Sequence, residues 1–137
     1  MTLPRTSIRT YVKSQLLGNT IANQNVFDTR VTTFFEKELP LINIMTLKEN
    51  DDVSNEGYSH NRPLYLGPLW ILAVISANVE DSPGVVIDNF CEQIMSKLDR
   101  HLGGNATRCE YTGTEIQIHA DGTVPHLMAI LTYDLEY

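Results

Sequence analysis

Apolar and polar side chains alternate along the last eleven residues, 127–137, and this pattern predicts a β-strand. Successive side chains of a strand point to opposite faces of the sheet, so every second residue lies on the same face. One face of this strand is apolar and must be covered by the rest of the chain. Its residues are Leu127, Ala129, Leu131, Tyr133, Leu135 and Tyr137.

Three further segments have the pattern of strands. Residues 40–47 are apolar and β-branched, which is typical of a strand covered on both faces. Residues 69–79 alternate, and we expect a long strand that is buried at its start and half-exposed at its end. Residues 108–120 alternate more weakly, and the turn signal at 121–122 predicts a hairpin with the last strand.

Two segments have apolar residues at helical spacing. The first covers residues 2–17 and ends at Gly18. The second has Ser82 as its cap and Pro83 in its first turn, and the glycines at 103–104 are its stop signal. The apolar stripe of the second helix consists of Ile87, Phe90, Cys91, Ile94, Leu98 and Leu102.

This order of elements predicts one α+β domain over residues 1–137. We expect a mainly antiparallel or mixed sheet of four or more strands, with two main helices packed on one face. A chain of 137 residues is long enough for one such core. Residues 48–63 are polar and have almost nothing to bury, so this long loop is expected to be mobile unless it binds something.

Charge limits the classes of partner. The chain has 10 Lys and Arg against 17 Asp and Glu, a net charge of −7, and its cations are dispersed along the sequence. Binding to phosphates needs clustered cations, so nucleic acid is a poor candidate partner. Neither a signal peptide nor an apolar run that spans a bilayer is found, so we expect a soluble cytoplasmic chain without a membrane partner.

Candidate metal ligands surround the last turn. His119 and His126 face each other across the predicted hairpin, and Asp121 is near them, so the three could hold a divalent metal in a small enzyme or ligand-binding module. Solvated surface histidines are the ordinary alternative. Acidic residues of the long loop could also chelate a hard cation, although their spacing is not that of a calcium loop. They are Asp51, Asp52 and Glu56.

The sequence has no pattern of nucleophilic catalysis. Cys91 lies on the apolar side of a predicted helix, Cys109 has no close cysteine neighbour, and the nucleophile elbow Gly-x-Ser-x-Gly does not occur. The glycine pair at 103–104 follows a helix, whereas a phosphate cradle precedes one. We therefore expect a protein that is not an enzyme and has no cofactor and no resident metal.

Aromatic residues are candidates for an interface. Phe34 and Phe35 are adjacent, and on a strand they would point to opposite faces, so one of them is difficult to bury in a small monomer. Trp70 is a second candidate. Core packing is the alternative for all three residues.

Several of these segments together resemble the tail terminator proteins of long-tailed bacteriophages, the lambda-type minor tail protein family. The resemblance covers nearly the whole chain. It includes the N-terminal amphipathic helix and the segments VFDTR at 26–30, Phe34, ELPLINI at 38–44 and AILTYDLEY at 129–137.

The resemblance implies a structural virion protein of the tail or neck, assembled in the host cytoplasm. Six identical subunits would form a ring that caps the tail tube, stops its polymerisation and presents a surface to the head-side connector protein. The partners would thus be further copies of the chain, the tail tube protein and the connector, with the negative charge at the lumen or the outer rim. The candidate interface residues are Arg30, Phe34, Phe35, Asp51, Asp52, Glu56, Tyr58 and Arg62. A connector or tail-completion protein of the neck is the alternative within the virion.

Overall fold

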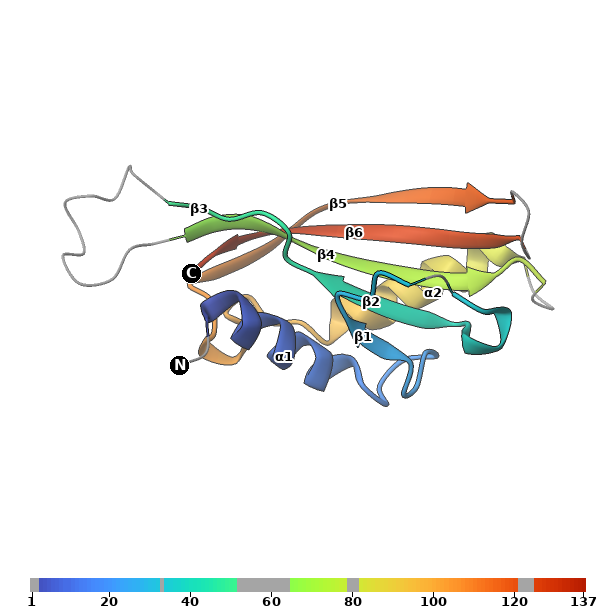
Figure 1. Ribbon diagram of the computed structural model, residues 1–137, viewed down its shortest axis with the longest axis horizontal. Helices are drawn as coiled ribbons and strands as arrows, with labels where there is room; N and C mark the ends of the chain where they lie inside the picture. The colour runs from blue at the N-terminus through green and yellow to red at the C-terminus, as the bar shows by residue number, and fades with distance from the viewer. Residues whose placement is uncertain (1–2, 33, 52–64, 79–81, 121–124) are drawn as a thin grey trace.

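The computed structural model describes residues 3–32, 34–51, 65–78, 82–120 and 125–137 (Figure 1). These residues form a sheet of six strands in the order β1-β2-β4-β6-β5, with β3 beside β4. The strands are β1 (Val26–Asp28), β2 (Leu41–Met45), β3 (Asn50–Asp51), β4 (Tyr65–Ser76), β5 (Arg108–His119) and β6 (His126–Glu136). The helices are α1 (Pro4–Leu16) and α2 (Pro83–Ser96), with short 3₁₀ turns η1 (Glu36–Glu38) and η3 (Leu102–Gly104).

Three long antiparallel strands, β4, β6 and β5, form most of the sheet. β4 pairs with β6 from Leu66 opposite Glu136 to Ser76 opposite His126, and β6 pairs with β5 along its whole length. β1 is parallel to β2, which makes the sheet mixed. The predicted α+β class and the terminal hairpin are therefore confirmed.

Both helices pack on the same face of the sheet. Their buried side chains join one core with the alternate residues of β4 and β6, and the apolar face predicted for residues 127–137 is part of it. Leu131 at 0 % exposure and Leu135 at 1 % exposure show how completely the helices cover this face. The helical residues of this core include Ile8, Val12, Leu16, Ile87, Phe90 and Ile94.

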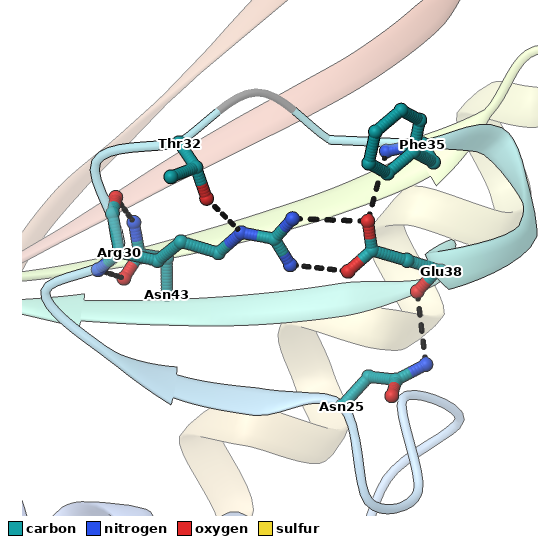
Figure 2. A network of polar contacts seen from close by, with 6 residues as sticks. All are labelled: Asn25, Arg30, Thr32, Phe35, Glu38 and Asn43. Carbon is teal, nitrogen blue, oxygen red and sulfur yellow. Dashed lines mark hydrogen bonds and ion pairs between the residues drawn. The ribbon is translucent and has the colours of Figure 1, made fainter.

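The second face of the sheet is buried only around β2. Leu41 and Asn43 point away from the helices, and both are buried, so β2 is covered on both faces as its composition predicts. Their neighbours on β4, Val74 and Leu72, are buried as well. Residues 30–32 and 34–38 lie over the second face of the sheet at β2 (Figure 2).

β4 begins four residues before the predicted start, and these first four residues are half-exposed. Within the predicted range the expected order is confirmed, because Leu69 is buried and Ser76 and Ala77 are half-exposed.

The second helix is shorter than the stripe of apolar residues predicts. α2 ends at Ser96, and Leu102 is buried within η3. The carboxylate of Asp99 accepts hydrogen bonds from the backbone N–H of Gly103 at 3.1 Å and from the hydroxyl of Tyr11 at 2.9 Å, and these contacts favour a turn over a further helical turn. Ser82 is at the cap position, but its hydroxyl makes no capping hydrogen bond.

α1 is confirmed within two residues at its start and one at its end, and residue 2, where the predicted helix begins, lies outside the described residues.

The start of the polar segment 48–63 belongs to the sheet, because residues 50–51 form a strand where the sequence pattern predicts a loop. Glu49 accepts a hydrogen bond from the Tyr137 hydroxyl and pairs with Arg5 of α1 at 3.0 Å. β3 follows directly, and Gly67 of β4 lets the backbone approach, because a Cβ there would lie 2.3 Å from the Lys48 carbonyl oxygen. Residues 52–63 lie outside the described residues.

The backbone of Tyr137 also pairs with that of Tyr65, and the start of α1 lies at the same end of the molecule as Tyr137 (Figure 1).

The turn after α2 yields a stability prediction. Gly103 has φ +62°, and an added Cβ would lie 2.5 Å from the Tyr11 ring. We expect Gly103→Ala to lower the free energy of unfolding by about 1–3 kcal/mol, because it strains the backbone and displaces Tyr11. Chemical denaturation measures the loss. Gly113→Ala is the matched control, since its Cβ would meet open space; equal effects of the two substitutions would contradict the prediction.

Candidate functional site

Arg30 and Glu38 form an ion pair that closes residues 30–38 into a turn on the second face of the sheet (Figure 2). The guanidinium is bidentate, with Nη2 at 2.9 Å from Oε1 and Nη1 on Oε2. It also lies 4.7 Å from the ring centroid of Phe27 and 5.4 Å from that of Phe34. Planar Arg is suited to this combination of a carboxylate fork and aromatic contacts. The Arg30 guanidinium lowers the pKa of Glu38 to about 2.

Two asparagines attach this turn to the sheet. Asn43, 2 % exposed, accepts a hydrogen bond from the backbone N–H of Arg30 at 2.8 Å and donates one to its carbonyl at 2.9 Å. Asn25 donates to the carbonyl of Glu38 at 2.9 Å. Both polar atoms of the buried Asn43 amide thus have a hydrogen-bond partner, and the two ends of the turn are fixed to β2 and to the residue before β1 (Figure 2).

The two adjacent phenylalanines do not lie on a strand, which corrects the geometry expected from the sequence. The Glu38 carboxylate accepts a hydrogen bond from the N–H of Phe35 at 3.1 Å, and this contact forms η1 in place of an extended segment. Phe34 is half-buried beside Arg30, whereas Phe35 is 61 % exposed. Lys37 lies next to it, with Nζ 5.9 Å from the Phe35 ring centroid. One of the two rings is indeed left without cover.

The candidate residues of the polar segment are not brought to this turn. Asp51 belongs to β3, which pairs with the first residues of β4, at the far end of the sheet from the Phe35 turn (Figure 1). The remaining candidates lie outside the described residues; they are Asp52, Glu56, Tyr58 and Arg62. Trp70, considered as an anchor, is half-buried on the face opposite the helices.

A groove between α2 and β5 is a surface that the sequence analysis missed. β5 has a partner on one side only, so it is an edge of the sheet, and α2 does not reach far enough to cover it. Ile116 is 45 % exposed, and Ile118 farther along the strand is 75 % exposed. The groove has a volume of about 580 Å³ and is lined by Asp88, Cys91, Glu92, Met95, Ser96, Tyr111, Thr114 and Ile116.

A β-bulge explains the weak alternation of β5 and the missed signal. Cys109 and Tyr111 point toward the helices, but after the irregularity between Tyr111 and Gly113 the even-numbered residues take that face. Thr114 and Ile116 therefore line the groove. If the alternating pattern of β5 is allowed one extra residue between Tyr111 and Gly113, the apolar residues before and after this point fall on the same face of the strand.

The groups considered for chemistry are not assembled into a site. Cys91 and Cys109 are buried free thiols, and burial raises the pKa of Cys91 to about 11 and that of Cys109 to about 12, so neither forms a thiolate near neutral pH. The rings of His119 and His126 stack with centroids 5.0 Å apart, and Asp121 lies outside the described residues. Within the described ranges, no group of three His, Cys, Asp or Glu residues is arranged to hold a metal.

Comparison with known proteins shows a likeness in fold. No family model matches the chain. No curated protein matches it either. Among solved structures, the chain is similar to one from the virion of a native gene transfer agent (GTA) particle, with a TM-score of 0.56 and 8 % sequence identity over 94 % of each chain. At this identity the likeness shows a shared fold over nearly the full length of both chains.

In the part of the chain that the structure describes, no helix has the length and apolar character needed to cross a membrane.

The ion pair yields a prediction for pH. The folded state holds the pKa of Glu38 near 2, below its ordinary value of 4.5, so the stabilisation is complete above about pH 4.5 and is lost as the pH falls toward 2. We expect Glu38→Gln to be less stable than the wild type at neutral pH, with a difference that shrinks in acid. Thermal unfolding of both proteins across this range measures it. A difference independent of pH would contradict this role of Glu38.

Proposed function

We propose that this chain is a structural virion protein that acts as a tail terminator. Copies of it form a closed ring of six on the end of the tail tube, stop polymerisation of the tube and present the joining surface to the head-side connector protein. The partners are thus other copies of the chain, the tube protein and the connector. The protein acts by shape and catalyses no reaction.

The likeness in fold to a chain of a gene transfer agent virion carries this proposal. It extends over 94 % of both chains, so it includes the whole arrangement of sheet and helices. The resemblance to tail terminators is independent of that comparison and gives the more specific role. It rests on the N-terminal helix, residues 26–30, Phe34, residues 38–44 and residues 129–137. A location in the tail or neck of a virion assembled in the host cytoplasm follows from the proposed role.

The surface of the subunit fits a protein that assembles. An aromatic ring stands exposed on a rigid turn, and an apolar groove lies beside an open edge strand. Patches of this kind on small proteins are typical of interfaces. The two buried thiols offer no nucleophile near neutral pH, which fits a role without covalent chemistry.

Electron microscopy of particles made without this protein tests the role. Loss of a terminator gives overlong tails, because nothing stops the growing tube. Tails of normal length beside unjoined or leaking heads would overturn the terminator role and favour a connector of the neck. Resupplying the purified protein during assembly is the control, and it should restore the normal tail length.

Self-association yields a second prediction. We expect Phe35→Asp to weaken the multimer by at least about tenfold in apparent Kd with little change in the midpoint of thermal unfolding, because the ring is exposed in the subunit. Sedimentation velocity over a concentration series, alone and with purified tail tubes, gives the first quantity. Phe34→Asp is the matched comparison and should lower the unfolding midpoint, because that ring is half-buried beside Arg30. An unchanged multimer in Phe35→Asp would remove this residue from the interface.

A further inference from the structure

Phe35 and Lys37 form a projection with one apolar and one cationic group. The Phe35 ring is 61 % exposed, and Lys37 is exposed with its ammonium 5.9 Å from the ring centroid. The Arg30–Glu38 ion pair and the hydrogen bond from the Phe35 N–H to Glu38 fix the backbone of this turn (Figure 2). The projection is therefore set before any partner arrives, which limits the conformational entropy lost on docking.

The groove between α2 and β5 is complementary to that projection. Its apolar lining includes Met95 and Ile116, both partly exposed. Met95 belongs to α2 and Ile116 to β5, and α2 also contributes the carboxylates of Asp88 and Glu92 to the lining. No Lys or Arg is among the described residues that line the groove. An aromatic ring can pack on the apolar side chains of this lining, and a positive charge beside the ring is attracted by its carboxylates. The groove therefore fits an occupant that carries both groups.

We propose that the groove of one copy receives the Phe35–Lys37 turn of the next copy. The Phe35 ring packs on Met95 and Ile116, and the Lys37 ammonium approaches the carboxylates of Asp88 and Glu92. This assignment rests on the proposed function, because it names the contact through which the ring closes. It also covers apolar side chains at the open edge of β5.

The position of the two surfaces requires a second copy. The turn is anchored on β1 and β2, whereas the groove lies at β5, the opposite edge of the sheet order β1-β2-β4-β6-β5. A chain cannot fill its own groove across that sheet. Each copy thus inserts its turn into one neighbour and receives the turn of the other neighbour in its groove. Such a head-to-tail contact forms a closed ring when the rotation between successive copies adds up to a full turn.

Charge reversal tests the contact. We expect Lys37→Glu and Glu92→Lys each to weaken self-association by about tenfold or more, and the double variant to recover most of the loss, because the ion pair is restored with its signs exchanged. Sedimentation velocity, alone and on purified tail tubes, measures the multimer. The matched controls are Lys97→Glu after α2 and Glu115→Lys on the opposite face of β5, which make the same charge changes outside the groove lining.

A mixing experiment tests the direction of the contact. A chain with a broken turn, Phe35→Asp, keeps its groove, and a chain with a broken groove, Met95→Asp, keeps its turn. Mixed together they should form heterodimers and stop there, because only one working contact remains between them. Heterodimers absent under conditions in which the wild type assembles would overturn the contact.

The outcomes separate this contact from the proposed function. A wild-type multimer on tail tubes that is unaffected by the charge reversals, or a double variant no better than the worse single one, overturns the docking of the turn in the groove and leaves the ring intact. A wild-type chain that remains monomeric both alone and on tubes overturns the ring and the contact together. Recovery in the double variant with unaffected controls supports both.

Discussion

The structure depends on covering β2 from both sides. Helices bury one face of that strand, and the other is buried beneath residues 30–38, which two asparagines and one ion pair hold in place. A buried amide such as that of Asn43 is costly without hydrogen-bond partners, and here the backbone of Arg30 provides one for the amide oxygen and one for the amide nitrogen. The same contacts that complete the core also present Phe35 to solvent. One turn therefore both completes the core and carries the residue that we propose for assembly.

Sequence patterns predicted the parts of the fold that depend on one covered face. The alternation at 127–137 follows directly from helices on one side of β6, and no distant contact was needed to read it. The end of α2 was not predictable in this way, because it depends on a hydrogen bond between Tyr11 and Asp99, 88 residues apart. The burial of Leu72 and Val74 on the second face of β4 likewise depends on a distant part of the chain, the turn that begins at Arg30.

Residues of the candidate site could be named from the sequence, but the shape of the turn that carries them could not. Arg30, Phe34 and Phe35 were identified from sequence, yet their local structure is set by the carboxylate of Glu38, which ends the extended backbone. The groove between α2 and β5 could not be predicted from the sequence for a different reason. The bulge in β5 shifts the apolar positions by one residue, and the length of α2 decides how much of that strand remains open. No single residue type in the sequence marks the position of the bulge or the length of the helix.

The position of the last residue, Tyr137, decides where a tag attached to the chain would stand on the subunit. Arg5 near the start of the chain and Tyr137 at its last residue meet on the side chain of Glu49, away from the Phe35 turn. A fluorescent label or affinity tag attached after Tyr137 would emerge on that side of the subunit. In the proposed ring all such tags would decorate a single rim, so a gold-conjugated tag would show which rim faces the tube.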